Sequence, residues 1–248
     1  MRARLALLLV IVMIVTAFAA RGADAKKVLA ICKGDQYIYF TKLAKKYDPS
    51  IVLTQAAVPS ETEPNLTDEG LAKFGAIILG EIAPTAGNTG SSCVTAAQQA
   101  AIKKRVEAGA NFFMFGGWSS FQGGSDSWCG EWFGTPIADL LPVTMMETWD
   151  NCDNPGKIVV DMPDHPTVAG LNWASCPPIG GHNKVTLKPG AVLIAHIKED
   201  NYPLIVEGKY GNSKILIYTS TYGGWDKEIM NWSGYKPLWF QFIKYVAQ

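Results

Sequence analysis

Three short, almost wholly apolar runs constrain the fold more than any other feature of this 248-residue chain. They are residues 27–32 (KVLAIC), 75–80 (GAIILG) and 111–115 (NFFMF). A strand without polar alternation must be covered on both faces, which is typical of a parallel sheet between helices. A further strand is predicted at 51–56, and helices are predicted at 37–47, 68–74 and 95–108. The sequence therefore predicts an α/β fold with a parallel sheet covered on both sides.

The second half of the chain has a different pattern, with shorter segments that alternate apolar and polar residues. A short helix is predicted at 136–141 and a closing helix at 235–246. Strands are predicted at 143–149, 157–161, 184–187, 191–198, 202–207 and 213–220. The last two flank residues 208–212, which hold two glycines and an asparagine, and they predict a β-hairpin. No repeat or linker interrupts the pattern, so a single domain is the simplest organisation.

The N-terminus predicts a cleaved secretory signal peptide over residues 1–25. Arg2 and Arg4 precede an apolar run at 5–20, and Ala23-Asp24-Ala25 forms a small-x-small end. An uncleaved membrane anchor is the alternative. No later run is long and apolar enough to span a bilayer. We therefore expect a secreted or exported protein whose single mature domain covers residues 26–248, without a stable membrane span after cleavage.

The charge of the predicted mature chain disfavours polyanionic partners such as nucleic acid. Without residues 1–25, acidic side chains outnumber basic ones by two, and phosphate backbones require clustered positive charge. Arg105 is the only arginine that remains, and it lies within a predicted helix. An arginine guanidinium, whose planar set of N–H donors binds carboxylates and phosphates, is therefore not expected at the site. Its absence favours a neutral ligand.

The chain has five cysteines: Cys32, Cys93, Cys129, Cys152 and Cys176. In an oxidising compartment this odd number predicts two disulfides and one free thiol. Cys32 ends a predicted buried strand and is the expected free thiol, whereas Cys152 and Cys176 lie in loop-like sequence and are a candidate pair. The remaining pairing is open, and no Cys-x-x-Cys is present to support a redox motif or zinc knuckle. Asn65 and Asn231 begin N-glycosylation sequons, which matter only in a eukaryotic host.

Residues 111–121 indicate a site at one edge of the predicted sheet. The apolar strand breaks at Gly116 and Gly117 and continues with Trp-Ser-Ser at 118–120. This is how a buried parallel strand ends when the chain turns sharply at the sheet's C-terminal edge. In several hydrolase and transferase folds the nucleophile sits on such an elbow, where strain pushes its side chain clear of the backbone. We therefore expect the functional site at this elbow.

Four stretches of the chain form a familiar pattern. They are Phe115–Phe121 (FGGWSSF), Gly134–Val143 (GTPIADLLPV), Asp164–Pro166 (DHP), and Tyr202–Leu204 (YPL) with Tyr210-Gly211. Together they resemble the glutamine amidotransferase-like family, relatives of the class I glutamine amidotransferases and of the trehalose-utilisation (ThuA-like) proteins. The resemblance covers nearly all of the predicted mature chain. It implies a flavodoxin-like α/β sandwich of the class I glutamine amidotransferase type, with a mostly parallel central sheet and extra β-hairpins in the second half.

The catalytic residues of that family do not carry over. Active amidotransferases place a cysteine on the elbow, in a Gly-x-Cys-x-Gly turn, and a His-x-Glu pair after a late strand. Here Trp118 or Ser119 takes the place of the cysteine, depending on how the two glycines are aligned. Residues 221–226 (TYGGWD) follow the late strand and contain no histidine. Without a thiolate and an imidazole at these positions, we do not expect glutamine hydrolysis.

Candidate site residues fall into two sets. Ser119 and Ser120 are candidate nucleophiles with His182 as their base, because a serine needs a base within hydrogen-bond reach. His165 and His196 are expected to be structural. The candidate ligand-binding residues are Gly117, Trp118, Glu81, Asn183, Trp225 and Asp226. No cofactor is expected, and no metal, because the spacing of the aspartates between 150 and 164 fits no calcium loop.

Three functional hypotheses stay open. The first is a secreted amidotransferase-like pseudoenzyme candidate that lacks the family's triad and binds a small neutral ligand, such as a carbohydrate, at the elbow. Aromatic faces with a few hydroxyl and carboxylate groups suit a neutral sugar, and the family's association with carbohydrate metabolism implies the same. The second is a serine-type hydrolase that uses Ser119 or Ser120 with His182. The third is a structural or interaction protein with a vestigial pocket, so whether the chain is an enzyme is open.

Overall fold

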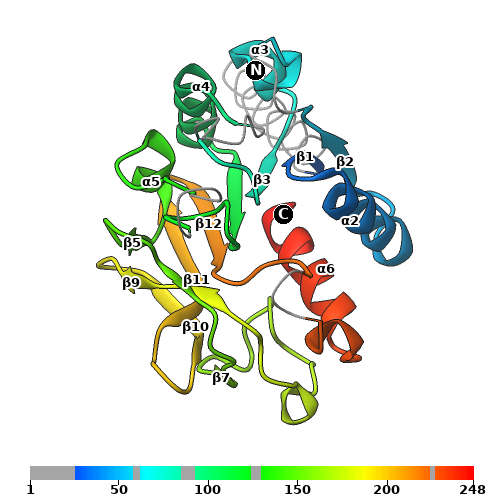
Figure 1. Ribbon diagram of the computed structural model, residues 1–248. Coiled ribbons are helices and arrows are strands. Elements are labelled where there is room, and N and C mark those ends of the chain that lie inside the picture. The colour runs from blue at the N-terminus through cyan, green and yellow to red at the C-terminus, as the bar shows by residue number, and fades with distance from the viewer. Residues whose placement is uncertain (1–25, 58–61, 85–92, 124–129, 224–226) are drawn as a thin grey trace, which may run out of the picture.

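The computed structural model describes residues 26–57, 62–84, 93–123, 130–223 and 227–248, and one eight-stranded sheet forms its centre (Figure 1). The strands lie in the order β2-β1-β3-β4-β12-β11-β10-β7. Their bounds are β1 Lys27–Ile31, β2 Val52–Gln55, β3 Ala76–Gly80, β4 Asn111–Phe115, β7 Ile158–Val160, β10 Val192–Ile197, β11 Pro203–Tyr210 and β12 Ser213–Tyr218. The predicted signal peptide lies outside the described residues.

The sheet is parallel on one side and antiparallel on the other. β2, β1, β3, β4 and β12 are parallel neighbours. β11 pairs antiparallel with β12 in the predicted hairpin, and β10 and β7 continue the antiparallel side. Two small antiparallel ribbons complete the strands, β5 (Val143–Met145) with β9 (Val185–Leu187) and β6 (Asn151–Cys152) with β8 (His182–Asn183). The predicted α/β fold, mostly parallel with extra hairpins, is confirmed.

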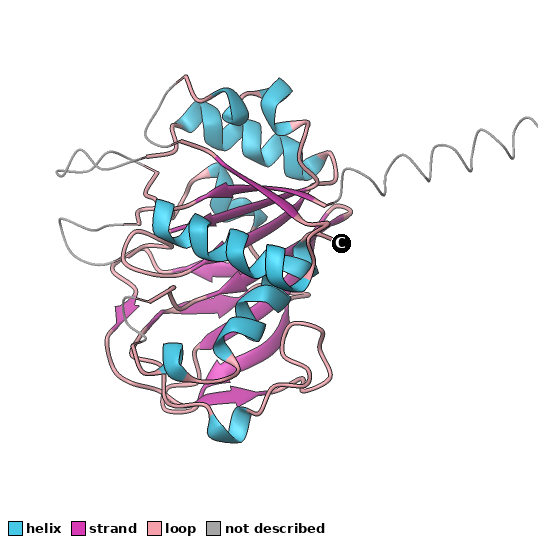
Figure 2. Ribbon diagram, turned by 90° about the vertical axis from the view of Figure 1, so that its right-hand side faces the viewer, coloured by secondary structure: helices cyan, strands magenta, loops and turns pink. Residues whose placement is uncertain are grey.

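Helices cover both faces of the sheet, as Figures 1 and 2 show. The helices α2 (Gly34–Tyr47) and α6 (Tyr235–Val246) pack together on one face, and α3 (Asp68–Leu71), α4 (Ala96–Glu107) and α5 (Pro136–Leu140) lie on the other. Short 3₁₀ helices occur at η1 (Pro64–Leu66), η2 (Trp173–Ser175) and η3 (Ile229–Asn231). Phe113 and Phe115 of β4 join the core beside α6, and Phe112 and Met114 join the core beside α4. A strand that supplies two cores needs apolar residues at every position, which explains the missing alternation.

Threonine side chains cap the N-termini of three helices, α3, α4 and α5. At the start of α4, Thr95 Oγ1 accepts a hydrogen bond from the Gln98 N–H at 3.3 Å, and Gln98 Oε1 accepts one from the Thr95 N–H at 3.0 Å. This reciprocal capping box satisfies two N–H groups that lack partners within the helix. Thr67 caps α3, because its Oγ1 accepts a hydrogen bond from the Gly70 N–H at 3.1 Å.

Arg105 has a structural role on α4. Its Nε donates to the carbonyl oxygens of Leu71 and Phe74, at 3.1 and 3.0 Å. These two carbonyls lie at and just beyond the end of α3, which stops at Leu71 rather than at the predicted residue 74. The one arginine among the described residues thus satisfies the carbonyls of a helix end.

The described residues contain no helix with both the length and the apolar character that crossing a bilayer requires. The two sequons differ in their surroundings. Asn231 is exposed, whereas Asn65 is half-buried and its Nδ2 donates to Glu63 Oε1 at 2.9 Å. Glycosylation of either asparagine stays a prediction.

The structure corrects the prediction of a disulfide between Cys152 and Cys176. Neither of these cysteines is in a disulfide, and the same holds for Cys32 and Cys93; Cys129 lies outside the described residues. Strand pairing closes this loop instead: Cys152 on β6 stands opposite His182 on β8. Cys32 is buried and free, as predicted, and burial raises the pKa of its thiol to about 12.

Trp239 anchors the core between the sheet and α6, and its removal should be costly. The residue is fully buried, and its ring centroid lies 5.2 to 5.8 Å from those of Phe40, Phe115, Tyr218 and Phe242. We expect Trp239→Ala to lower the free energy of unfolding by about 3–5 kcal/mol, measured by urea denaturation, because a large cavity remains. Trp149→Ala is the matched control, since Trp149 is 60% exposed, and it should change stability by about 0.5 kcal/mol or less. Equal losses in the two variants would contradict the core position of Trp239.

Candidate functional site

The chain turns sharply where β4 ends, and Gly117 is the residue at the bend. Its φ is 132°, a conformation that residues with side chains rarely adopt. A Cβ atom at this position would lie 1.2 Å from Glu81 Oε1, so only glycine fits. Gly117 therefore stands at the elbow, where sequence reasoning placed Trp118 or Ser119. The elbow residue of this chain carries no side chain.

Glu81 follows β3 and places its carboxylate against Gly117. Its φ of 54° is uncommon for a residue with a side chain. The backbone is held there because the Glu81 N–H donates to Ser120 Oγ at 2.8 Å. The carboxylate is held as well, because Thr221 Oγ1 donates to Oε1 at 2.8 Å and Lys33 Nζ donates to Oε2 at 3.2 Å. Segments that follow β1, β3, β4 and β12 thus meet at one carboxylate.

A cavity of about 610 Å³ opens beside this carboxylate, at the C-terminal edge of the parallel strands. The described residues that line it are Lys33, Asp35, Gln36, Glu81, Trp118, Thr221, Tyr222, Gly223, Lys227 and Met230. Trp118 is 45% exposed and supplies a flat aromatic face, whereas Glu81 is 9% exposed. The structure therefore brings two of the predicted ligand-binding residues, Trp118 and Glu81, to the cavity. Trp225 and Asp226 lie outside the described residues.

Gly117 and Asn183, also predicted to bind ligand, are buried and are not among the residues that line the cavity. Asn183 Oδ1 accepts from the Gly117 N–H at 2.8 Å, and Asn183 Nδ2 donates to the Gly117 carbonyl at 3.2 Å. The same Nδ2 donates to Asp150 Oδ1 at 2.8 Å. Asp150 also accepts from the N–H groups of Gln122 and Gly123, each at 2.8 Å. The Asn183 amide thus joins the elbow to the loop that follows it.

Asp150 is the residue of this site that sequence reasoning missed. It is fully buried, and burial raises the pKa of its carboxyl to about 7, while its hydrogen bonds to Asn183, Gln122 and Gly123 act in the opposite direction. From the sequence, Asp150 is only a candidate calcium ligand, because it lies among the polar, loop-like residues that follow the strand predicted at 143–149. Nothing in that local pattern indicates burial, since the contacts of Asp150 come from segments that are distant in sequence.

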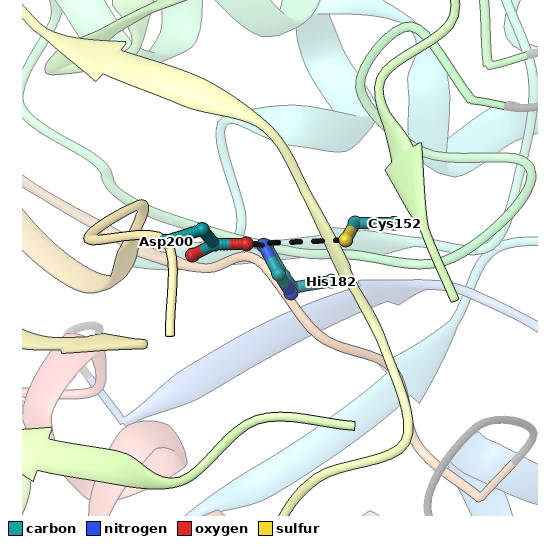
Figure 3. A group of neighbouring side chains, drawn as sticks. All are labelled: Cys152, His182 and Asp200. Atoms are coloured by element: carbon teal, nitrogen blue, oxygen red, sulfur yellow. Dashed lines mark hydrogen bonds and ion pairs between the residues drawn. The ribbon is translucent and has the colours of Figure 1, made fainter. Parts of the chain in front are cut away.

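The structure does not bring the predicted catalytic residues together. Ser120 is buried and its Oγ accepts the Glu81 N–H, while Ser119 is half-buried at the elbow. His182 is fully buried on β8, and neither ring nitrogen has a hydrogen-bond partner, so no hydrogen bond joins it to either serine. Its Nε2 lies 3.1 Å from Asp200 Oδ2 instead (Figure 3). Burial lowers the pKa of the His182 imidazole below its ordinary value.

The other two histidines each pair with one carboxylate. His165 Nε2 lies 2.8 Å from Glu207 Oε2, and His196 Nδ1 lies 2.8 Å from Asp161 Oδ2. Neither is among the residues that line the cavity. Their partners are consistent with the structural roles that the sequence predicts for them.

Residues 36–248 match the protein family GATase1_like, which is described as "Putative glutamine amidotransferase". The match covers well over half of the chain, including β3, β4, β12 and every residue that lines the cavity except Lys33 and Asp35. No curated protein sequence is significantly similar to this chain.

Solved structures of similar fold come from several kinds of protein. Cytoplasmic protein STM1381 from Salmonella typhimurium LT2 is 21% identical, with a TM-score of 0.72 over 90% of this chain and 100% of that one. A ThuA-like protein from Parabacteroides merdae is 12% identical, with a TM-score of 0.59 over 90% of each chain. Agd3, named a carbohydrate deacetylase, is 16% identical, with a TM-score of 0.59 over 89% of this chain and 32% of that one. At these identities the likeness shows a shared fold.

The contact between Gly117 and Glu81 predicts a high cost for Gly117→Ala. We expect the free energy of unfolding, measured by urea denaturation, to fall by about 2 kcal/mol or more, because the new Cβ would collide with Oε1 and the positive φ would be strained. Gly109→Ala is the matched control, since Gly109 has a φ of 108° but nothing within 4 Å of an added Cβ. In a Glu81→Ala background the cost of Gly117→Ala should fall to that of Gly109→Ala. An unchanged cost would show that Glu81 does not crowd the elbow.

Asp150 predicts a contribution to stability that depends on pH. Its folded-state pKa of about 7 lies above its ordinary value of 3.8. The contribution is therefore fully present below about pH 4 and is lost as the pH rises through about 7. We expect the difference in free energy of unfolding between the native chain and Asp150→Asn to decrease from about pH 4 to about pH 8 in urea denaturation. Asp153→Asn, at an exposed position, should leave the profile unchanged; an increase of the Asp150 difference with pH would contradict a raised pKa.

Proposed function

The chain belongs to the glutamine amidotransferase-like family GATase1_like, and from that premise we propose that it binds a small neutral ligand, such as a carbohydrate, at the elbow. The observation that carries the proposal is an exposed indole, Trp118, beside a fixed carboxylate, Glu81, in a cavity of about 610 Å³. A cavity of this size accommodates a small molecule. Aromatic faces stack on the apolar faces of sugar rings, and a carboxylate accepts hydrogen bonds from their hydroxyl groups.

The charge of the cavity supports a neutral ligand. Lys33 and Lys227 are balanced by Asp35 and Glu81 among the described lining residues. Lys33 also donates to Glu81 at 3.2 Å, so an anionic ligand would have to compete with that carboxylate for the ammonium group. The described residues that line the cavity include no arginine. A guanidinium group there would favour carboxylates or phosphates as ligands.

The proposal includes the absence of glutamine hydrolysis. Amide attack by this family's route needs a thiolate at the elbow and an imidazole beside it. The elbow residue is Gly117, and the Glu81 carboxylate occupies the space that a side chain at 117 would take. None of the described cysteines or histidines is among the residues that line the cavity.

Two further parts of the proposal come from the sequence and from similar structures. The basic, then apolar, then small-residue pattern of residues 1–25 supports export with cleavage of a signal peptide. The fold that the chain shares with Agd3, a protein named a carbohydrate deacetylase, fits a carbohydrate ligand, although the chain spans only 32% of that protein. The serine-hydrolase alternative has less support, because Ser120 Oγ is engaged by the Glu81 N–H and His182 is hydrogen-bonded to neither serine.

A thermal-shift screen of neutral sugars tests the proposal. We expect at least one neutral mono- or disaccharide to raise the melting temperature, since a ligand at 100 times its Kd stabilises the folded state by about 2.7 kcal/mol. L-glutamine and sugar phosphates should give no shift. Trp118→Ala should abolish the sugar-dependent shift, because it removes the stacking face of the cavity. Trp149→Ala is the matched control, since Trp149 is 60% exposed and does not line the cavity.

Two results would count against this function. If no neutral sugar stabilises the chain, or if Trp118→Ala retains the full shift, the cavity does not bind sugars through its indole and a vestigial pocket is favoured. If a sugar ester or glycoside is turned over, and Ser119→Ala abolishes the turnover but retains binding, the serine-hydrolase alternative is favoured.

A further inference from the structure

A second group of polar side chains lies behind the elbow, on the β6–β8 ribbon. Cys152 and His182 stand directly opposite each other in the antiparallel register. Asp200, in the turn between β10 and β11, completes what we call the Cys–His–Asp cluster (Figure 3). Asn151 and Asn183 form the other pair of the ribbon, and they project to its opposite face because side chains alternate along a strand. The ribbon therefore presents Asn183 to the elbow and the cluster to its other face.

The separations within the cluster suit a metal ion. One ligand atom from each of the three residues lies within 4.8 Å of the others. His182 Nε2 is 3.1 Å from Asp200 Oδ2, and Cys152 Sγ is 3.9 Å from the same oxygen. In a tetrahedral zinc site, bonds of about 2.0–2.3 Å place the ligand atoms about 3.4–3.6 Å apart. These two separations lie on either side of that value, and the third, between Cys152 and His182, is no more than 4.8 Å, so modest shifts of the side chains would allow one ion to contact all three.

His182 supplies an independent observation that points to a ligand. The side chain is fully buried, and neither ring nitrogen has a hydrogen-bond partner. Its Nε2 lies 3.1 Å from Asp200 Oδ2, in a geometry that does not form a hydrogen bond. Buried polar atoms in native proteins nearly always have a partner, because a buried atom without one has lost its hydrogen bonds to water. A cation bonded to Nε2 would supply that partner.

The Asp200 carboxylate is oriented by its own turn. Its Oδ1 accepts a hydrogen bond from the Tyr202 N–H at 3.1 Å, which leaves Oδ2 facing Cys152 and His182. Asn201, which lies between Asp200 and Tyr202 in the sequence, has a φ of 59°. This is a left-handed conformation that asparagine adopts more readily than most residues. The Asp200 side chain is 29% exposed, so an ion could enter from solvent and a water could reach a fourth ligand position.

We propose that Cys152, His182 and Asp200 bind one zinc ion, with water as the fourth ligand. A thiolate and an imidazole favour zinc over magnesium or calcium, which prefer oxygen ligands. Binding breaks the Cys152 S–H bond and releases its proton to solvent. The thiolate and the Asp200 carboxylate then balance the two positive charges of Zn²⁺, and His182 binds as the neutral imidazole. Three protein ligands with one open position are the arrangement of catalytic zinc sites.

The test uses the purified full chain after removal of metal with EDTA. Calorimetric titration with Zn²⁺ should give one site per chain, and Co²⁺ should give a thiolate-to-cobalt charge-transfer band. Cys152→Ser should abolish that band and weaken zinc binding roughly 100-fold or more, since the loss of even a hydrogen-bonding partner of a ligand costs 10–100-fold. Cys176→Ser is the matched control: Cys176 is likewise outside any disulfide but is not in the cluster, so this variant should retain both the band and the affinity.

A second variant keeps the test valid if Cys152→Ser fails to fold. Asp200→Asn retains the carbonyl that can accept the Tyr202 N–H, and it lies at the exposed side of the cluster. It should weaken zinc binding but keep the thiolate-to-cobalt band, with an unchanged circular dichroism spectrum. The proposal is overturned if the native chain binds no zinc, if Cys152→Ser binds it as tightly as the native chain, or if Cys152 is found in a disulfide. The proposal is also overturned if zinc does not slow the alkylation of Cys152, a result that would favour a role of this thiol as a nucleophile.

Discussion

The close approach of the Glu81 carboxylate to Gly117 is the constraint on which the rest of the elbow depends. A side chain at 117 would collide with it, so this elbow cannot present a nucleophile in the usual way. The carboxylate lies there because Glu81 adopts a positive φ, and the strain is offset by hydrogen bonds with Ser120, Thr221 and Lys33. Glu81 thus leaves no space for a side chain at the elbow position where the family carries its cysteine. The same residue places a carboxylate, held by hydrogen bonds, at the edge of the cavity.

The same elbow is held from behind by the β6–β8 ribbon. Asn183 bonds both the N–H and the carbonyl of Gly117, and its own N–H donates to the Thr219 carbonyl just after β12. Through Asp150 the amide also holds the loop that follows the elbow. A carboxylate that is fully buried yet accepts three N–H donors is costly to desolvate but precise in its geometry. These hydrogen bonds therefore fix the backbone of the elbow next to the cavity, although the elbow itself begins with two glycines.

The central strands β1, β3 and β4 could be predicted because each of them supplies residues to two cores and is almost wholly apolar. The hairpin of β11 and β12 could be predicted for a different reason, because turn residues separate its two strands in the sequence. The site depends on contacts between distant segments, which no local pattern reports: Glu81 meets Gly117, and Asn183 meets Asp150. The predicted Cys152–Cys176 disulfide is wrong on the same ground, because pairing of two-residue strands closes that loop, and strands so short have no readable period.

The Cys–His–Asp cluster is beyond sequence reasoning for a related reason: its members are 30 and 18 positions apart, whereas zinc motifs are recognised by short, regular spacings. Its composition depends instead on the register of one ribbon. A slip of one residue in β8 would turn His182 toward the elbow and Asn183 toward Asp200, because a strand alternates its faces. The hydrogen bonds of Asn183 to Gly117 and Asp150 oppose that slip. The contacts that shape the elbow therefore also select the imidazole, rather than an amide, as the side chain that faces Cys152.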